Sequence, residues 1–430
     1  MKSPCLCRSV AVLIGALLLG GCGGGGGIAA SSGTTPAPAA TPHPGSVTYY
    51  FSDCQAGAQA GCVAGSNANA GTSMSAPKQD LSGIDVNTLP AGSQLLFNRG
   101  GAWSWTSTLR LDNRNTTAAA PLTFGAYGAG VAPLIRQSSA FLVETGEWLN
   151  TVPDGGYVFR GLKLEGLAAA PQDAKAIWLR GTVSDVLIED VEFTGYYIAL
   201  YGQGHDDVQR VTVRNSRFIR NKGMGVLGTF NNSLFEGNLF EGNNFSGSGF
   251  EHGTYLSNFT NLTLRNNVYL RNSVVNGVCQ GGNMTFHGQV DGLLIEGNRI
   301  EQDAAAPGCW LVSITQGYST AEWFLNVVVR NNKLINGGNT GVAAQSAPGI
   351  LVEGNVVINA QATNQTAISV GHTDYPNGDV PDGDATVRDN TACQSGGATG
   401  SVTNVTAPNS TVTNNVIVTG AAATTGVCAR

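Results

Sequence analysis

The run VLIE (186–189), followed by VTVR (211–214) and SLFE (233–236), decides the fold, because each short β-rich run ends in a charge opposite to that of the run before. Nine runs alternate in this way at spacings between 22 and 35 residues, and they end in Arg160, Glu189, Arg214, Glu236, Arg265, Glu296, Arg330, Glu353 and Arg388. Neighbouring parallel strands lie about 4.8 Å apart, and opposite charges on one face attract. The alternation therefore predicts a backbone that coils and lays each run on the previous one.

An Asn stands two residues after each of the later charges, and once more after Thr413. These residues are Asn238, Asn267, Asn298, Asn332, Asn355, Asn390 and Asn415. Asn tolerates the left-handed backbone conformation, and stacked Asn side chains can bond one another. We expect both repeats to fix register, since an exposed ion pair contributes only about 0–1 kcal/mol and a slipped coil would bring like charges together. Repeats of variable length with a constant β–turn–β centre predict an all-β solenoid.

Over about residues 150–420 these repeats resemble those of right-handed parallel β-helix proteins of the pectate-lyase-like superfamily. The resemblance extends upstream through YYFSDCQAG (49–57), GTSMSAPKQDL (71–81) and LPAGSQLLFNRGGAW (89–103). It implies a single-stranded right-handed parallel β-helix of about ten coils over 151–430, with residues 47–150 leading into the core and capping it. The superfamily includes lyases, hydrolases, epimerases, adhesins and phage tail proteins, so the resemblance predicts the fold more than the function.

The first residues are typical of an exported bacterial lipoprotein. Lys2 and Arg8 precede an apolar run over 10–19 that is too short for a retained transmembrane helix, and LGGC (19–22) resembles a lipobox. We predict a signal peptide over 1–21, a lipid on Cys22 and a flexible linker over 22–46. Ordinary cleavage that leaves Cys22 free is the alternative. The expected location is the cell envelope, with the lipid anchor as the only membrane contact.

The cysteines after Cys22 are even in number, which favours disulfides in an exported chain. Neighbours in the sequence suggest the pairs Cys54–Cys62, Cys279–Cys309 and Cys393–Cys428, although six cysteines allow fifteen pairings.

The net charge of −6 argues against a nucleic-acid partner. We expect a monomer.

A candidate site lies along the third strand of the coils. Four of the five His (His205, His252, His287 and His372) fall at or near this strand, and His43 is in the linker. We place Leu200, Val226, Leu256, Phe286 and Ile314 inward at equivalent positions, so that their neighbours point outward. The catalytic candidates are Lys222, Glu251, His252, Tyr255 and His287. The substrate-binding candidates are Trp178, Arg180, Tyr196, Tyr201 and Gln316.

Two reactions compete at this site. β-Elimination on a uronic acid polymer needs a group that neutralises the carboxylate, a base and an acid, for which Lys222, His252 or His287, and Tyr255 are available. Hydrolysis needs two carboxylates, and Glu251 has only the distant Asp206 as a partner. The residues therefore favour a polysaccharide lyase. A glycoside hydrolase and a non-catalytic glycan binder or adhesin, with aromatic rings stacked on sugars, are the alternatives.

The loop HTDYPNGDVPDGDA (372–385) contains Asp374, Asp379, Asp382 and Asp384. Oxygen-rich loops can bind Ca²⁺, but Asp-Gly turns are also common in solvated loops. We expect no metal and no cofactor, with Ca²⁺ as the alternative.

Overall fold

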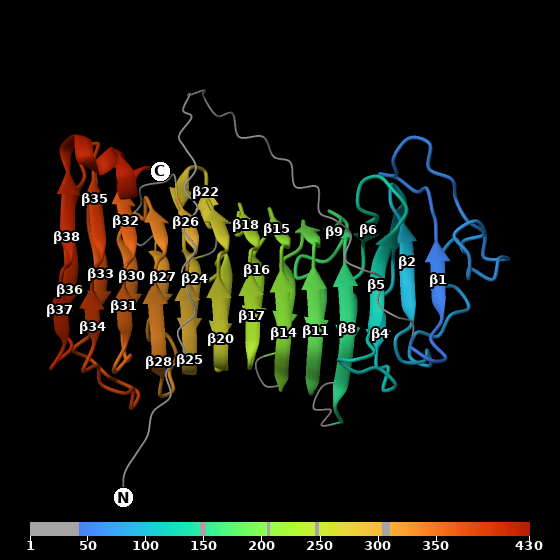
Figure 1. Cartoon of the computed structure of the whole chain (residues 1–430), viewed down its shortest axis with the longest axis horizontal. Coiled ribbons are helices and arrows are strands. Elements are labelled where there is room, and N and C mark those ends of the chain that lie inside the picture. The colour runs from blue at the N-terminus through green and yellow to red at the C-terminus, as the bar shows by residue number, and fades with distance from the viewer. Residues whose placement is uncertain (1–42, 147–151, 204–206, 246–248, 303–309) are drawn as a thin grey trace, which may run out of the picture. The chain divides into compact units, whose positions relative to one another are not determined.

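The computed structural model describes residues 43–146, 152–203, 207–245, 249–302 and 310–430. Together they belong to one compact unit, built from three long parallel sheets (Figure 1). The predicted signal peptide, Cys22, His205, Asp206 and Cys309 lie outside the described residues. No described helix is long and apolar enough to cross a membrane.

Sheet A has 13 strands. They are β1 (Thr48–Phe51), β2 (Gln94–Asn98), β5 (Leu122–Tyr127), β8 (Asp154–Arg160), β11 (Val183–Glu189), β14 (Val208–Arg214), β17 (Ser233–Glu236), β20 (Thr260–Arg265), β25 (Gln289–Glu296), β28 (Trp323–Arg330), β31 (Leu351–Glu353), β34 (Thr386–Arg388) and β37 (Thr411–Thr413).

Sheet B has 12 strands. They are β3 (Ala102–Trp105), β6 (Leu134–Gln137), β9 (Lys163–Gly166), β12 (Glu192–Thr194), β15 (Arg217–Ile219), β18 (Leu239–Glu241), β21 (Val268–Leu270), β26 (Arg299–Glu301), β29 (Lys333–Ile335), β32 (Val356–Asn359), β35 (Thr391–Gln394) and β38 (Val416–Thr419).

Sheet C has 11 strands. They are β4 (Leu109–Leu111), β7 (Phe141–Thr145), β10 (Lys175–Leu179), β13 (Ile198–Gly202), β16 (Met224–Gly228), β19 (Thr254–Ser257), β24 (Gly282–His287), β27 (Trp310–Ile314), β30 (Thr340–Ala344), β33 (Asn364–Val370) and β36 (Thr399–Val405). A small hairpin, β22 (Val274–Val275) and β23 (Val278–Cys279), and two 3-10 turns, η1 (Gly420–Thr424) and η2 (Gly426–Cys428), complete the described elements.

Successive strands visit sheets A, B and C in turn, so the chain forms a coil. Each strand pairs in parallel with the strand one coil earlier and one coil later. Eleven coils contribute a strand to all three sheets within the described residues, and the predicted parallel β-helix is confirmed. Residues 47–150, which we expected to lead into the core and cap it, supply β1 to β7, so the coils begin well before residue 151.

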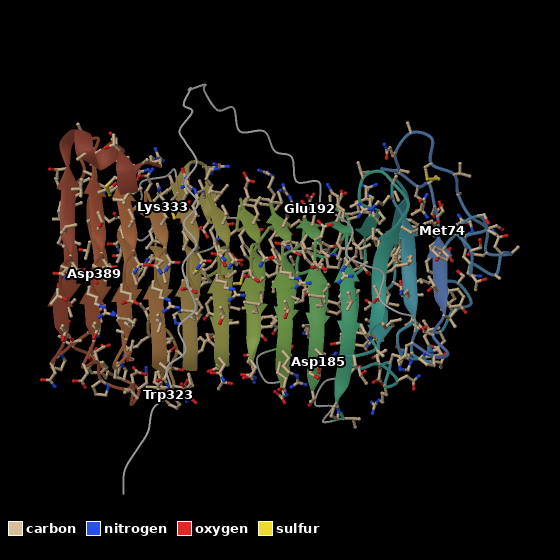
Figure 2. The ribbon with its side chains drawn as sticks, viewed as in Figure 1. Met74, Asp185, Glu192, Trp323, Lys333 and Asp389 are labelled. Atoms are coloured by element: carbon tan, nitrogen blue, oxygen red, sulfur yellow. A yellow bond between two sulfur atoms is a disulfide. The ribbon has the colours of Figure 1, made fainter. Side chains whose placement is uncertain are left out.

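The charge alternation has the predicted cause. Glu236 stands in register between Arg214 and Arg265, and the Nε of Arg265 lies 2.7 Å from its carboxylate. A second charged row in sheet B places the Glu192 carboxylate 2.9 Å from Lys163 and 3.1 Å from Arg217 (Figure 2, Glu192 labelled). A coil that slipped by one residue would turn its charged side chain to the other face and break these ion pairs, so these rows hold the register.

The predicted Asn ladder is also confirmed, with one correction. The Nδ2 of Asn238 donates to the Oδ1 of Asn267, one coil on, at 3.0 Å, and the Nδ2 of Asn267 donates to Asn298 in the same way at 3.0 Å. The left-handed residue is not the ladder Asn but the one before it, such as Gly237 or Asn266. The ladder Asn instead points inward and satisfies buried backbone groups that the bend leaves unpaired.

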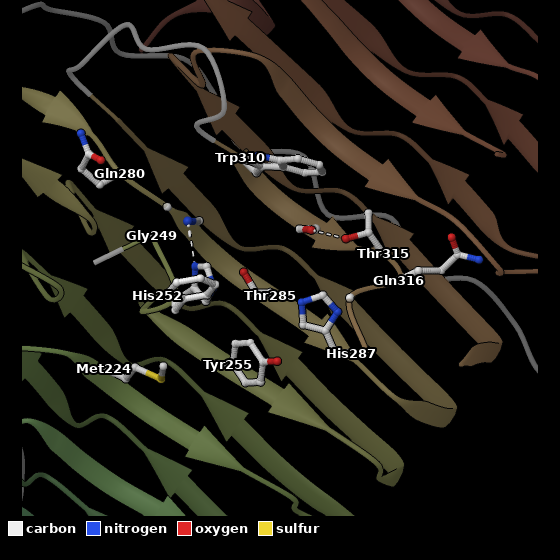
Figure 3. A pocket seen from close by; sticks show the side chains of 15 residues that line it. Met224, Gly249, His252, Tyr255, Gln280, Thr285, His287, Trp310, Thr315 and Gln316 are labelled. Atoms are coloured by element: carbon white, nitrogen blue, oxygen red, sulfur yellow. Dashed lines mark hydrogen bonds between the residues drawn. The ribbon is translucent and has the colours of Figure 1, made fainter. Parts of the chain in front are cut away.

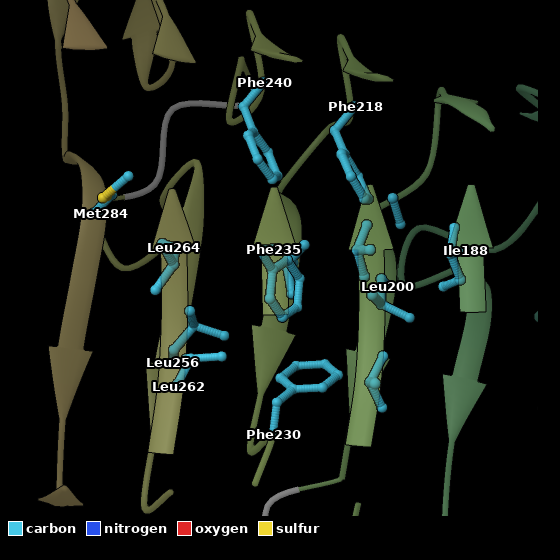
Figure 4. Packing of buried hydrophobic residues seen from close by; sticks show 14 of the residues in the cluster. Ile188, Leu200, Phe218, Phe230, Phe235, Phe240, Leu256, Leu262, Leu264 and Met284 are labelled. Atoms are coloured by element: carbon cyan, nitrogen blue, oxygen red, sulfur yellow. The ribbon is translucent and has the colours of Figure 1, made fainter. Parts of the chain in front are cut away.

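Aromatic side chains stack inside the coils as well. Phe193, Phe218, Phe240 and Tyr269 form a continuous stack in the core, with ring centroids 4.8, 4.7 and 4.4 Å apart. Figure 4 shows two of them, Phe218 and Phe240. A parallel β-helix places equivalent residues of successive coils directly above one another, so stacked rings fill its core without gaps.

Two of the predicted disulfides are present, Cys54–Cys62 and Cys393–Cys428. Cys279 is buried, and its predicted partner Cys309 lies outside the described residues.

Candidate functional site

The candidate site lies on the outer face of sheet C. One outward row runs along the coils through Trp178, Tyr201, Leu227, Tyr255 and Thr285, which pair in register. The predicted alignment was wrong by two residues at one step, because Val226 pairs with Thr254 and not with Leu256. A shift of two residues preserves the inward and outward alternation, so the expected outward residues keep their face.

A groove with a volume of about 460 Å³ lies over β16, β19, β24 and β27 (Figure 3). Its lining includes four predicted residues, His252, Tyr255, His287 and Gln316. The other lining residues are Met224, Gly249, Phe250, Gln280, Gly281, Gly282, Thr285, Trp310, Ser313, Thr315 and Gly317. None of these described lining residues is Asp, Glu, Lys or Arg.

His252 is held as a neutral ring. It precedes β19, so strand alternation does not separate it from Tyr255, and the two rings stack with centroids 5.5 Å apart. Its Nδ1 accepts a hydrogen bond of 3.0 Å from the backbone N–H of Gly282. Burial, together with the nearby His287, lowers the pKa of His252 to about 3. The proton of the neutral ring therefore sits on Nε2, which makes His252 a hydrogen-bond donor toward a ligand.

His287 ends β24 and has a buried carboxylate behind it. Its Nδ1 lies 3.7 Å from Oε1 of Glu322, and the Glu322 side chain is fully buried. The backbone N–H groups of Gly288, Gly317 and Tyr318 all donate to this carboxylate. Burial raises the pKa of Glu322, but the neighbouring imidazole and these N–H groups outweigh it and hold the pKa below its usual range. An ionised carboxylate at this place favours the His287 tautomer with the proton on Nδ1, which leaves the Nε2 lone pair available.

Tyr255 stands beside His287, with ring centroids 5.2 Å apart. Its hydroxyl donates to the hydroxyl of Tyr318 at 3.0 Å. Burial, followed by this hydrogen bond, raises the pKa of Tyr255 well above its usual value. Tyr255 therefore stays protonated at neutral pH and can supply a proton or a hydrogen bond in the groove.

Three other predicted residues do not line the groove. Glu251 is almost fully buried and accepts a hydrogen bond from the hydroxyl of Tyr197, and Lys222 is outside the lining. Tyr196 is a correction, because its side chain is fully buried in the core and cannot contact a ligand on the surface. It lies before β13, where strand alternation does not define the direction of a side chain.

Trp178 and Tyr201 lie on β10 and β13 of sheet C, in the two coils before β16, and Arg180 directly follows β10. The Trp178 and Tyr201 rings stack with centroids 5.7 Å apart, and the Arg180 guanidinium lies 4.8 Å from the centroid of the Trp178 ring. Phe141 packs against Trp178 at 4.6 Å. Because neighbouring side chains occupy the faces of the Trp178 ring, this group resembles a structural stack more than a sugar-binding platform.

The Asp-rich loop 372–385 serves as a support. Asp382 accepts hydrogen bonds from the backbone N–H groups of Ala347 and His372, and Asp379 accepts one from the N–H of Glu322 at 2.8 Å. Among the described residues, no three His, Cys, Asp or Glu side chains are grouped so that they could hold a metal ion. The loop instead fixes the segment that carries Glu322.

Sequence reasoning missed Glu322, Tyr318 and Trp310. Glu322 lies in the connection before β28, outside every repeat, and only its three-dimensional position reveals its contact with His287. A Glu in a loop with neighbouring Gly317 and Tyr318 carried no periodic signal.

Residues 172–313 match the family model described as right handed beta helix region. A comparison with curated proteins finds no match. Among solved structures, a mannuronan C-5 epimerase A-module from Azotobacter vinelandii is 16% identical, with a TM-score of 0.53 over 76% of this chain and 89% of that chain.

Two further solved structures show the same likeness. A GH136 lacto-N-biosidase from Eubacterium ramulus is 12% identical, with a TM-score of 0.52 over 85% of this chain and 68% of that chain. A rhamnogalacturonan lyase is 15% identical, with a TM-score of 0.51 over 86% and 87% of the two chains. At such identities the likeness concerns the fold. By its coils and by these comparisons, the chain is a right-handed parallel β-helix protein.

Proposed function

We propose that the protein is a polysaccharide lyase that cleaves a uronic-acid-containing glycan by β-elimination. The observation that carries the proposal is a groove whose described lining includes His252, Tyr255 and His287 and no carboxylate. Hydrolysis needs two carboxylates at the scissile bond, about 5–5.5 Å or 6.5–9.5 Å apart. The similar folds of an epimerase and a lyase that act on such glycans give the proposal circumstantial support.

His287 is the base in this proposal. Its Nε2 takes the proton from C5 of the sugar, the electron pair forms the C4–C5 double bond, and the bond between C4 and the leaving oxygen breaks. The buried Glu322 carboxylate stabilises the imidazolium that forms. His252 cannot take this role, because its Nδ1 already accepts a hydrogen bond and its Nε2 carries the proton.

Tyr255 is the acid. It is protonated at neutral pH, lies against His287, and can pass its hydroxyl proton to the leaving oxygen. In the free protein this proton is donated to the hydroxyl of Tyr318, so the O–H bond of Tyr255 has to rotate toward the leaving oxygen when substrate binds. The Nε2–H of His252 and the Gln280 side chain are donors for the sugar carboxylate in the lining.

The test is an assay of the purified protein on alginate, pectate and glycosaminoglycans that follows the ultraviolet absorbance of unsaturated ends. We expect activity on at least one of them, and we expect His287→Ala to reduce kcat by about 10²–10⁴-fold, as for loss of a general base. His372→Ala is the matched control, because His372 lies in the Asp-rich loop and not in the groove lining. Absence of unsaturated ends on all substrates, or equal activity of both variants, would contradict the proposal.

Non-catalytic binding of a neutral glycan is the second candidate. It is favoured by the absence of Lys and Arg from the described lining, since a free uronate carboxylate lacks a cationic partner there. In that case the wild-type protein would bind neutral oligosaccharides without product formation, and His287→Ala would keep much of the affinity.

We also propose that Cys22 is lipidated and anchors the protein to the cell envelope. The support is the lipobox-like LGGC (19–22) behind a short apolar run. Metabolic labelling with a radioactive fatty acid tests this: we expect label in the wild-type protein and none after Cys22→Ala. A labelled variant or an unlabelled wild-type protein would refute it.

A further inference from the structure

The last coil leaves the hydrophobic core open. Sheets A, B and C end in β37, β38 and β36, and no described strand follows them. Val412 continues the inward column of Val352 and Val387, which are fully buried, yet it is 44% exposed. Ile417 continues the inward column of Ala392 and is also 44% exposed. Core positions and the outer edges of three strands are therefore uncovered at the same end.

The residues after β38 do not cover this end within the described structure. They form η1 and η2 and turn back along sheet B, where Cys428 is bonded to Cys393 (Figure 1). At the end of the tail, the carbonyl of Ala429 accepts a hydrogen bond from Lys333 of β29, and the Arg430 guanidinium lies 3.4 Å from the Glu301 carboxylate of β26. The tail thus leads away from the open coil.

The uncovered coil also lacks charge. Residues 390–429 contain no Asp, Glu, Lys, Arg or His, and Thr413 pairs with Arg388 where the ladder would next place an acidic residue. Exposed edge strands usually carry charges or Pro that prevent pairing with other chains, and β36, β37 and β38 carry none. An uncharged edge with exposed apolar residues is suited to contact with another strand.

The opposite end limits the ways in which two copies of the chain can meet. There, residues between β1 and β2 close the core, since Val86 and Leu89 are buried in it and the Trp103 indole donates to the carbonyl of Gln79. A second copy therefore cannot add its open end to this closed one. Two open ends can meet, and a two-fold axis brings identical surfaces together, which the uncharged coil permits without repulsion.

We propose that two copies of this chain form a tail-to-tail dimer through β36, β37 and β38. The two-fold arrangement is closed, because the described residues of each copy leave one end of the coil open. It extends sheets A, B and C across the axis and covers Val412 and Ile417. This replaces the monomer that we expected from the sequence, and it is independent of the proposed function.

The experiment combines sedimentation equilibrium of the full chain with amide hydrogen exchange of β36, β37 and β38. We expect a dimer, with edge amides that exchange faster on dilution. Thr413→Glu should raise the dissociation constant by at least about 100-fold, because it places a charge in an otherwise uncharged interface, while the new Glu can pair with Arg388 and keep the coil folded. Thr212→Glu on β14 is the matched control and should leave the dimer intact.

Three results would overturn the proposal. The first is a monomer at all concentrations with fast exchange at these edges, which would mean that the end is free. The second is a monomer with protected edges, which would mean that a segment of the same chain covers it. The third is a dimer that survives Thr413→Glu unchanged.

Discussion

Two stretches of the outer face of sheet C contain stacked aromatic rings, and the second of them borders the candidate groove. In the first, Trp178 is packed between Tyr201 and Arg180, and Phe141 closes the stack. In the second, His252 and Tyr255 stack and their edges line an open volume of about 460 Å³. The same row of the same sheet therefore carries packed side chains at one place and borders a candidate site at another.

The difference comes from the size of the outward side chains next to the aromatic rings. Near Trp178 the neighbouring outward residues are long and fill the surface, as Lys175 does by lying 5.6 Å from the Trp178 ring. Near Tyr255 the outward neighbour one coil on is the small Thr285, followed by Ser313. Small side chains in the row leave the space, and the segments around Gly281 and Gly317 form its walls. Aromatic composition alone thus does not distinguish a site from a stack.

The first prediction in this comparison concerns the carboxylate of Glu322. Glu322→Gln removes the charge that stabilises protonated His287 but keeps the size of the side chain, so we expect kcat to fall by about 10–100-fold with little change in KM. Steady-state kinetics on the responsive substrate measures both. Asp154→Asn, a buried acid far from the groove lining, is the control for general destabilisation. An unchanged kcat would remove Glu322 from the mechanism.

The next effect concerns Tyr255. Tyr255→Phe keeps the ring between His252 and His287 but removes the hydroxyl, so we expect the fold to be retained and kcat to fall by about 10²-fold or more. Circular dichroism and the absorbance assay check the two parts. Tyr201→Phe in the sealed stack is the matched control, and equal losses in both variants would erase the proposed difference between the two stretches.

Trp178 should matter for stability instead. Trp178→Ala opens the stack, and we expect the free energy of unfolding to fall by about 2 kcal/mol, less than for a fully buried Trp because this ring is partly exposed. Thermal or denaturant unfolding measures this. Activity should stay near that of the wild type, and a selective loss of substrate affinity would instead make the stack a binding surface.

The smallest effect is the pH dependence that arises from His252. Its pKa is about 3 in the folded protein and about 6.5 when unfolded, so the unfolded chain binds the extra proton between these values. The stability due to the neutral ring is therefore complete above about pH 6.5 and is lost as the pH falls toward 3. We expect the wild type to lose on the order of 1–3 kcal/mol more than His252→Asn between pH 7 and pH 4. Parallel curves for the two proteins would contradict the burial of a neutral His252.

The coils could be predicted because their evidence is periodic. Each coil repeats a charge and an Asn, so that Glu236 or Asn267 reveals its neighbours in the sequence, and the structure places them as expected. The outward face of Tyr255 and His287 followed from alternation along a strand. Tyr196 failed because it precedes β13, where alternation gives no direction, and its side chain is buried.

The remainder of the candidate site could not be predicted, because it depends on connections between coils. Glu322 reaches His287 only because the loop around Asp379 holds its backbone in place, and nothing in the spacing of these residues indicates that contact. The sealed state of Trp178 likewise depends on the packing of Lys175 and Arg180, which composition does not specify.

The mass of the cleavage products is the most direct test of the account. A β-elimination that starts at His287 in a groove without a lining carboxylate adds no water to the glycan. Mass spectrometry of the oligosaccharides released in ¹⁸O-labelled water should therefore show unsaturated products without the label, and His287→Ala should release none. Hydrated products that carry ¹⁸O would contradict the account, because hydrolysis requires a pair of carboxylates, and the described lining of the groove contains none.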